Sequence, residues 1–394
     1  MPHPRGLMVL SVLLLALVAC GRTPVPLTHD AYVWQRQWSP SLTFALNQSA
    51  DLIRDWRVLA AQTDAKGQLR NVAIDRAALA ATGRPVILVV RIDGQLVQWD
   101  EDALIAQIVA LRNDGAGVAG IEIDHDCGTA RLPAYAHFLG RLKLSLGTLP
   151  LSITALPAWL SSRDLDTVLG AVDEAVLQVH AVQSPRAGLF DVALAQQWVG
   201  TFAKRSKKPF RVALPNYGSK VSWDGDGRMI AIESEAPALS AGAESRELAA
   251  APRDVARLLK MLHDDPPAHF AGVVWFRLPT ADDVRSWSLP TWRAVIQGRP
   301  LTAQVAAIAQ PGAVAGALDI LLRNDGDVDA SLPIALSLPH DCAIADGING
   351  YQLDRRSDGL YLKRSQDGWL RSHRQRQVGW MRCTSSKVDI HVAN

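Results

Sequence analysis

The sequence lacks a surplus of charge of either sign. Lysine and arginine total 41 and aspartate and glutamate 39, so the formal net charge of the 394 residues is +2. Nucleic-acid binding is dominated by phosphate and needs a concentrated excess of basic residues, so the balance argues against such a partner. The 48% of hydrophobic residues is ordinary for a globular protein, and the length favours more than one domain.

Several motifs of known chemistry are also missing. No G-x-S-x-G, Walker A or C-x-x-C motif occurs, which disfavours a serine hydrolase, a nucleotide hydrolase and a thioredoxin-type protein. The glycines at 115 and 117 precede a predicted strand instead of following one, which disfavours a Rossmann-type dinucleotide site. We therefore expect no cofactor.

No apolar run is long enough for a permanent membrane span. The apolar run over residues 7–19 follows Arg5 and would rise only about 20 Å as a helix, short of the roughly 30 Å hydrocarbon core. This pattern predicts a secretion signal over residues 1–19. The segment that follows, residues 20–29, contains Pro24 and Pro26 and is expected to be a short, stiff tether.

The end of that signal, Leu17-Val18-Ala19-Cys20, resembles the lipobox of bacterial lipoproteins. The resemblance implies that the signal is cleaved before Cys20 and that lipid chains, palmitate among them, are attached at this cysteine. The lipid would anchor the protein to a membrane. Gly21 rather than Asp follows the cysteine, which by the Gram-negative sorting pattern favours the outer membrane, facing the periplasm. An ordinary cleaved signal is the alternative.

Cysteines are few, and three remain beyond the anchor: Cys127, Cys342 and Cys383. A compartment outside the cytoplasm permits disulfides. Cys342 and Cys383 both lie in the last hundred residues, so their pairing is the economical prediction, which leaves Cys127 as a free thiol.

A repeated strand and helix rhythm runs from about residue 30 to 298. Helix-like segments such as Asp100–Arg112 and Asp191–Lys204 alternate with short apolar or β-branched runs. The predicted strands are Ala31–Gln37, Trp56–Gln62, Pro85–Ile92, Val118–Asp124, Leu149–Ala155, Ala175–Ala181, Phe210–Pro215 and Ala271–Leu278. Eight such units match an α/β fold of the (β/α)8 TIM-barrel type over residues 30–298 better than an open sheet.

Two regions depart from this rhythm. The connection over residues 217–250 is unusually long, and its Asp224 and Asp226 favour a hairpin turn over a calcium loop. Residues 299–394 show alternating strand-like runs without a convincing helix, which predicts a small C-terminal β-sandwich domain. A basic strip of Arg371, Arg374, Arg376 and Arg382 is best explained as a solvated strand face, with a site for acidic glycans or lipid head groups as the alternative.

The fourth predicted strand carries an unusual set of acids. Its alternation puts Glu122, Asp124 and Asp126 on the face that points into the barrel. Burial and mutual repulsion raise the pKa of carboxyl groups, so one of them could keep its proton near neutral pH and act as a general acid. A buried polar cluster that only braces the barrel is the structural alternative.

Residues 119–126, A-G-I-E-I-D-H-D, resemble the strand-four signature of family 18 chitinases, D-G-x-D-x-D-x-E. The resemblance implies a glycoside-hydrolase-like barrel, Asp126 as proton donor, and Asp124, helped by Glu122, as the partner that stabilises positive charge. Asp126 replaces a Glu and is one methylene shorter. The succession AYVWQRQW, GIEIDHDC, LPLSITALPAWL and GVVWFRLP also resembles a bacterial envelope family labelled domain of unknown function 3142, which implies the barrel and the secreted context but no activity.

Further candidates lie where other strands end and would contact a sugar. They are Trp34, Gln35, Asp93, Trp159, Gln178, His180, Asn216, Tyr217, Trp275 and Arg277. By the chitinase resemblance, Gln178 and His180 take the place of that family's Met and Tyr, and Trp275 that of the tryptophan at its pocket floor. A metal bound by His125 and His180 is disfavoured, because His125 should point away from the interior; we expect no metal.

The leading hypothesis is an envelope-anchored, glycoside-hydrolase-like lipoprotein that acts on or binds a polysaccharide at the end of the fourth strand. The first alternative is a glycan-binding lipoprotein without turnover. The second is an envelope assembly protein whose C-terminal domain, residues 299–394, binds another envelope protein.

Overall fold

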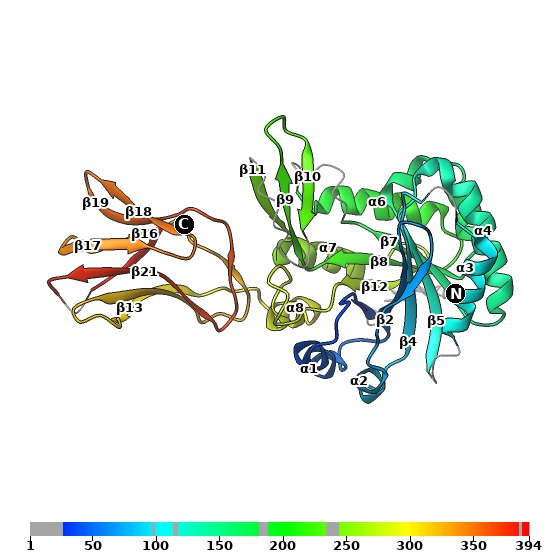
Figure 1. The fold of residues 1–394 in the computed structure, drawn as a ribbon, viewed down its shortest axis with the longest axis horizontal. Helices are drawn as coiled ribbons and strands as arrows, with labels where there is room; N and C mark the ends of the chain where they lie inside the picture. Colours follow the sequence, from blue (N-terminus) through cyan, green and yellow to red (C-terminus); the bar gives the residue numbers. More distant parts are fainter. Residues whose placement is uncertain are drawn as a thin grey trace, which may run out of the picture.

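The structure is a computed structural model that describes residues 27–96, 99–112, 117–180, 188–233, 244–385 and 388–393. Within these ranges eight parallel strands close into a barrel in the order β1-β12-β8-β7-β6-β5-β4-β2, and β2 pairs with β1 (Figure 1). The strands are β1 (His29–Val33), β2 (Trp56–Thr63), β4 (Val86–Ile92), β5 (Val118–His125), β6 (Leu151–Ala155), β7 (Glu174–Gln178), β8 (Phe210–Pro215) and β12 (Phe270–Phe276). The predicted TIM-type barrel is confirmed, with a short extra strand β3 (Leu69–Asn71) antiparallel to β2.

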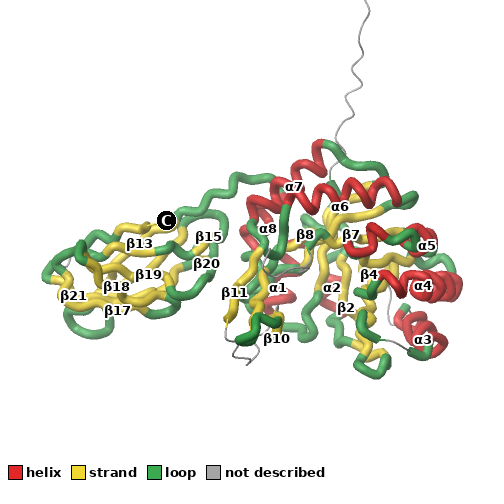
Figure 2. The backbone as a smooth tube through the Cα atoms, turned by 90° about the horizontal axis from the view of Figure 1, so that it is seen from above, coloured by secondary structure: helices red, strands yellow, loops and turns green. Residues whose placement is uncertain are grey.

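Helices cover the outside of the barrel (Figure 2). They are α1 (Pro40–Ser49), α2 (Arg76–Ala81), α3 (Glu101–Leu111), α4 (Leu132–Leu146), α5 (Leu165–Gly170), α6 (Val192–Arg205), α7 (Pro252–Asp264) and α8 (Leu289–Ile296), with the 3-10 turns η1 (Thr129–Arg131) and η2 (Pro157–Ser161). Aspartates begin two of the predicted helices: Asp100 accepts a hydrogen bond from the Ala103 N–H at 3.0 Å, and Asp191 from the Leu194 N–H at 2.8 Å. In the described part of the chain, no helix is both long and apolar enough to cross a membrane.

Side chains fill the barrel interior in layers, because every second residue of each strand points inward. Near the amino ends of the strands the inward residues are charged, and Arg57 and Glu122 are fully buried there. A middle layer is apolar and is formed by Tyr32, Leu59, Val89, Val176, Ala213 and Val274. The layer at the carboxyl ends is polar again and contains Arg91 and Asp124.

The long connection after β8 forms an antiparallel sheet of its own, in the order β10-β9-β11. Its strands are β9 (Gly218–Trp223), β10 (Met229–Glu233) and β11 (Glu244–Ala249). The Asp224 carboxylate accepts from the N–H groups of Asp226 at 3.0 Å and Arg228 at 2.8 Å, so the acidic pair closes a hairpin turn. Glycine is required at position 218, because a Cβ there would lie 2.5 Å from the Leu248 carbonyl oxygen on β11.

The C-terminal region consists of antiparallel sheets (Figure 1). One described sheet contains β13 (Val305–Pro311), β14 (Leu318–Asn324), β21 (Gln375–Cys383) and β17 (Cys342–Gly347). A second contains β18 (Tyr351–Arg356), β19 (Gly359–Arg364), β16 (Ala335–Ser337) and β22 (His391–Ala393), and β15 (Ala330–Ser331) pairs with β20 (Trp369–Leu370). Apolar residues of both sheets share one core, as expected of a sandwich. A disulfide joins Cys342 to Cys383 across β17 and β21, and Cys127 is a buried free thiol.

The predicted signal peptide, residues 1–19, and Cys20 lie outside the described residues, as does the tether up to residue 26. Lipidation at Cys20 and the membrane anchor therefore stay predictions.

Candidate functional site

Asp124 lies at the carboxyl end of β5 and is almost completely buried, with 2% of its surface exposed. Its Oδ1 accepts a hydrogen bond from Thr154 Oγ1 on β6 at 2.7 Å, and its Oδ2 from Arg91 Nη1 on β4 at 3.4 Å. Burial and the negative charge of Asp126 raise the pKa of Asp124 to about 6, although Arg91 and the Thr154 hydrogen bond oppose the rise. Asp124 therefore stays protonated at pH values at which an ordinary aspartate is already ionised.

Asp126 follows β5 directly and is the accessible member of the pair, since 40% of its side chain is exposed. Its Oδ2 lies 3.8 Å from Arg91 Nη2, so one guanidinium contacts both carboxyl groups. Partial burial raises the pKa of Asp126, and the Arg91 charge acts in the opposite direction. The arrangement is a coupled acid pair that shares one cation, which is the kind of environment that sets up proton transfer.

Aromatic side chains form one wall of the same mouth. The Phe276 ring lies 5.3 Å from both the Trp34 ring and the Tyr217 ring, measured between centroids. The Arg91 guanidinium lies over Trp34 at 5.8 Å, which connects this wall to the acid pair. Aromatic faces beside carboxyl groups are suited to hold a sugar ring, whose carbon face is apolar and whose edge is polar.

His180 supplies a polar atom within this wall. Its ring stacks on Phe276 at 5.4 Å, and its Nδ1 lies 3.3 Å from the Tyr217 hydroxyl. Burial lowers the pKa of His180 to about 4, so the imidazole is neutral at physiological pH. Its Nε2 is buried and has no hydrogen-bond partner among the described residues. A buried polar atom of this kind is a place for a ligand hydroxyl.

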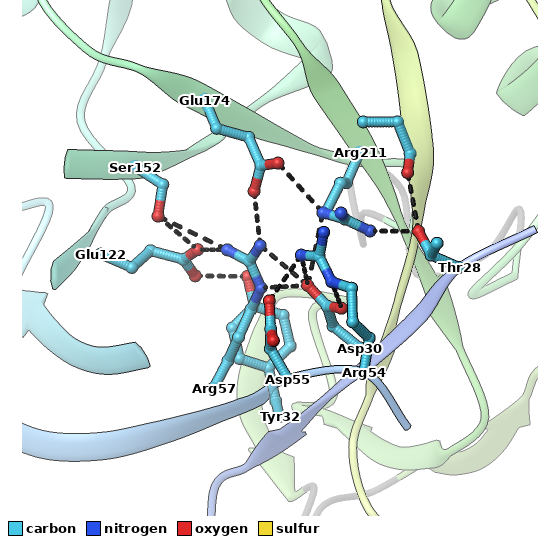
Figure 3. Close-up of polar contacts among 11 residues, drawn as sticks. Thr28, Asp30, Tyr32, Arg54, Asp55, Arg57, Glu122, Ser152, Glu174 and Arg211 are labelled. Atoms are coloured by element: carbon cyan, nitrogen blue, oxygen red, sulfur yellow. Dashed lines mark hydrogen bonds and ion pairs between the residues drawn. The ribbon is translucent and has the colours of Figure 1, made fainter. Parts of the chain in front are cut away.

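Glu122 shares the inward face with Asp124 but does not join the acid pair; Figure 3 shows it beside Arg57, Tyr32 and Ser152. It points inward as expected but lies one layer deeper, where Arg57 donates to one of its oxygens and the Tyr32 hydroxyl donates to the other at 2.5 Å. Arg57 also pairs with Asp30 at 3.0 Å and with Glu174 at 2.5 Å. Glu122 belongs to a buried ion network that braces the closed end of the barrel.

Trp275 is also placed differently from the prediction. It points outward into the core between the barrel and the helices, fully buried, with Trp287 and Trp292 as neighbours. Its Nε1 donates to His29 Nδ1 at 3.1 Å. The next residue, Phe276, points inward because neighbouring residues of a strand face opposite sides. Phe276, not Trp275, contributes the strand-eight ring to the mouth.

The remaining predicted residues divide into supporting and structural positions. Arg277 is buried, pairs with Asp283 at 2.5 Å and lies over Tyr217 at 5.6 Å, so it positions that ring. Asn216 donates to the Arg277 carbonyl at 2.8 Å. Trp159 is fully buried and its Nε1 donates to the Cys127 carbonyl at 2.8 Å, so it is a core residue and not a sugar contact.

Three predicted rim residues lie outside the acid pair's contacts. Gln35 donates from Nε2 to the Leu278 carbonyl at 3.2 Å, and the Asp93 carboxylate accepts from the Gln95 N–H at 2.8 Å, so both shape connections. Gln178 is half-buried at the end of β7.

His125 points outward, with its Nδ1 3.1 Å from the Ile92 carbonyl, while His180 points inward, so these two histidines do not share a ligand position.

Arg91, Thr154 and Phe276 were not predicted from the sequence. A signal for Arg91 was present: in the run Val89-Val90-Arg91 the arginine shares a face with the inward residue Val89. An inward charge at the end of a barrel strand is unusual enough to mark a site. Thr154 and Phe276 are ordinary residues in apolar strands, and only the closed barrel shows that they face Asp124 and Trp34.

The comparisons with known proteins agree with this fold. A family model described as domain of unknown function (DUF3142) matches residues 82–281, and a second, domain of unknown function (DUF8456), matches residues 307–384. The structure is similar to the spore cortex-lytic enzyme SleL of Bacillus megaterium QM B1551, with a TM-score of 0.52 and 13% identity over 70% of this chain and 75% of that one. A search of curated proteins found no match.

A chitinase of Chromobacterium violaceum ATCC 12472 has a TM-score of 0.49 and 14% identity over 69% of this chain and 98% of that one. A chitinase of Bacteroides thetaiotaomicron has a TM-score of 0.49 and 14% identity over 64% of this chain and 90% of that one. Identities this low concern the fold alone.

Proposed function

The chain belongs to the DUF3142 family, and from its site we propose that it is an envelope-anchored, glycoside-hydrolase-like protein that cleaves a polysaccharide at the carboxyl end of the barrel. One observation carries the proposal: Asp124 and Asp126 form a coupled carboxyl pair joined through Arg91, in the position where TIM barrels hold their reactive groups. The anchor is the lipid predicted at Cys20, with the barrel facing the periplasm.

Asp126 is suited to be the proton donor, because its exposed carboxyl can reach a glycosidic oxygen and its raised pKa helps to keep the proton. The proton passes to the leaving oxygen while the bond from the anomeric carbon to that oxygen breaks. The carboxylate that remains lies beside Arg91, whose charge stabilises it. Water supplies the hydroxyl group that the anomeric carbon finally gains.

Asp124 is suited to stabilise the positive charge that develops at the anomeric carbon, since its ionised form is a buried anion held in place by Thr154. His180 Nε2 orients a sugar hydroxyl, and the rings of Trp34 and Phe276 lie against each other beside Arg91. The roles expected from the sequence for Asp124 and Asp126 are thus retained in the proposal, and Glu122 takes no part.

Binding without turnover is the second candidate. Asp126 is one methylene shorter than the Glu of the signature it resembles, and Arg91 favours the ionised form of both carboxyl groups. Either feature would weaken proton donation while leaving the aromatic wall intact.

The test is release of reducing ends from a panel of envelope and exopolysaccharide glycans. We expect Asp126→Asn and Asp124→Asn each to lower kcat by about 100-fold or more, because each removes a group that acts in the transition state. Activity should fall as the pH rises through the pKa of Asp126, since only its protonated form donates. Fractionation of wild type and Cys20→Ser tests the anchor: the serine variant should leave the membrane fraction.

Asp265→Asn is the matched control, because this exposed residue follows α7 at the opposite end of the barrel. Hydrolysis that is equal in wild type, Asp124→Asn and Asp126→Asn would refute the mechanism. Glycan binding without hydrolysis, weakened by His180→Phe, would establish the second candidate, because phenylalanine keeps the stacking on Phe276 and removes the imidazole nitrogens.

A further inference from the structure

A groove of about 1140 Å³ lies between the barrel and the C-terminal domain, apart from Asp124 and Asp126. On the barrel side it is lined by α1, by β11 and by the connection from β12 to α8. On the other side it is lined by Trp369 of β20, by residues 371–374 and by Arg376, so three arginines of the basic strip seen in the sequence lie there. Figure 1 shows the C-terminal domain beside α8 and the β9–β11 sheet.

The two sides are held together by a buried carboxylate, Asp329, from the C-terminal domain. Its Oδ2 accepts from the Ser288 N–H at 2.7 Å on the barrel side and from Arg371 Nη1 at 3.0 Å. Its own N–H donates to Thr291 Oγ1 at 2.8 Å. The groove is therefore a built feature with fixed walls.

The groove concentrates positive charge in a chain that is nearly neutral overall. Its lining has seven arginines and only three acidic residues. The arginines are Arg285, Arg293, Arg299, Arg364, Arg371, Arg374 and Arg376. Such a local excess attracts anions even where the total charge does not.

Three of these arginines have no carboxylate partner within the described part of the chain: Arg299, Arg374 and Arg376. Arg376 donates to the Asn349 carbonyl at 2.7 Å, which leaves its charge uncompensated. Arg299 and Arg374 are exposed. Guanidinium groups of this kind bind carboxylates through two parallel hydrogen bonds.

Apolar side chains lie among these charges. Phe44 on α1 is 61% exposed and Val284 is 65% exposed, and both line the groove. Trp369 on β20 lines the opposite side and is partly exposed. The groove thus offers aromatic rings on both walls together with unpaired guanidinium groups.

We propose that this groove binds an acidic polysaccharide, a chain of sugar rings that carry carboxylate groups. Rings of Phe44 and Trp369 pack against the apolar faces of sugars, and the arginines bind the carboxylates. The volume exceeds what a single small ligand needs, so several sugar units fit. The inference rests on the proposed function in taking the ligand to be a polysaccharide, and it names the class of that substrate.

The groove also adjoins the candidate active site. Asp283 lines the groove and binds Arg277, and Arg277 lies over Tyr217, whose hydroxyl contacts His180. A glycan chain in the groove would therefore be separated from the wall residue Tyr217 by the side chains of Asp283 and Arg277. Binding there would hold the polymer on the protein while another part of it reaches Asp126.

The test is binding of polygalacturonate, alginate and hyaluronate to the full mature protein, with methyl-esterified polygalacturonate as a probe of equal ring chemistry without charge. Arg299→Gln/Arg374→Gln should weaken binding of the acidic glycans about tenfold, because two exposed charges are lost. Arg163→Gln/Arg355→Gln is the matched control: both residues are exposed, one lies in each part of the molecule, and neither lines the groove. Phe44→Ala should weaken binding with no change in charge.

The proposal is overturned if wild type binds none of the three acidic glycans, if it binds the esterified polymer equally well, or if both double variants bind like wild type. A DNA oligonucleotide that binds as tightly as the acidic glycans, or more tightly, would also overturn it, since the groove would then recognise phosphate groups and not sugar carboxylates. Failure of the proposed function is distinguishable: a neutral glycan hydrolysed in an Asp126-dependent way with no effect of the groove variants refutes only the groove. Groove-dependent binding with no effect of Asp124→Asn or Asp126→Asn on any glycan refutes only the catalytic mouth.

Discussion

Asp124 and Glu122 are both buried carboxyl groups on one strand, and their partners give them different roles. Glu122 is paired with Arg57, an arginine that is itself fully buried. Asp124 has only the longer contact to Arg91, whose side chain is 40% exposed, and a second acid nearby. Burial raises the pKa of both carboxyl groups, and at Asp124 the negative charge of Asp126 adds to the rise, so the charge of Asp124 costs the fold stability.

Asp124→Asn should stabilise the barrel at neutral pH. The pKa of Asp124 is about 6 in the folded protein against 3.8 for an ordinary aspartate, so the folded state binds its proton more tightly. The free energy of unfolding contributed by this group therefore falls as the pH rises from about 4 through 6. The variant lacks that loss and should be more stable than wild type at pH 7.5 by about 2–3 kcal/mol.

Urea unfolding at pH 4, 6 and 7.5 measures this difference, which should shrink towards pH 4. Asp265→Asn serves as the control and should follow wild type. If the free energy of unfolding changes with pH in the same way for wild type and Asp124→Asn, then Asp124 is ionised without cost in the folded state.

Strand alternation predicted the face of each acid correctly but not its depth. Glu122 and Asp124 both point inward, yet the partner of Glu122 is Arg57, which comes from a strand 65 positions earlier. No local pattern shows which layer such a distant side chain reaches. Trp275 shows the converse: its role was taken from a resemblance, while alternation alone would have placed Trp275 and Phe276 on opposite faces.

At the scale of elements, the barrel strands were predictable because each is a short apolar or β-branched run bounded by turns or helices. The β9–β11 sheet was predicted only as a hairpin turn. Its third strand, β11 (Glu244–Ala249, ESRELA), is mostly exposed, so it has little apolar alternation to recognise. Its pairing with β9 depends on the absent side chain of Gly218 and not on a hydrophobic face.

The strands β17 and β21 are joined by the Cys342–Cys383 disulfide, which stabilises the C-terminal domain. Cys342→Ser/Cys383→Ser opens a loop of 41 residues and should lower the free energy of unfolding of the C-terminal domain by about 4 kcal/mol, because the unfolded chain regains conformational freedom. Calorimetry with and without reductant measures the loss. The double variant should not respond to reductant, and an unchanged melting temperature in the reduced wild type would contradict the prediction.

For the whole molecule, the position of the C-terminal domain depends on the Asp329 contacts. Asp329→Ala removes a buried acceptor from the Ser288 and Ser372 N–H groups and from Arg371, which should cost roughly 2–3 kcal/mol of docking. Small-angle scattering should then show a larger radius of gyration, and chymotrypsin should cleave faster after Leu301, between α8 and β13.

Asp327→Ala is the matched control, because it removes an exposed carboxylate of the same domain that lies 3.3 Å from His373 Nε2. Scattering curves that coincide for Asp329→Ala and wild type would mean that other contacts fix the two parts. Acidic glycan binding should weaken together with docking, since the groove needs both walls.

The apolar middle layer of the barrel has a consequence for how any polymer is handled. Tyr32, Leu59, Val89, Val176, Ala213 and Val274 are all buried and plug the cylinder between its two ends. A polysaccharide chain therefore cannot pass through the barrel from one end to the other. Substrate and product must enter and leave at the carboxyl end, and a long polymer can only bind across that end.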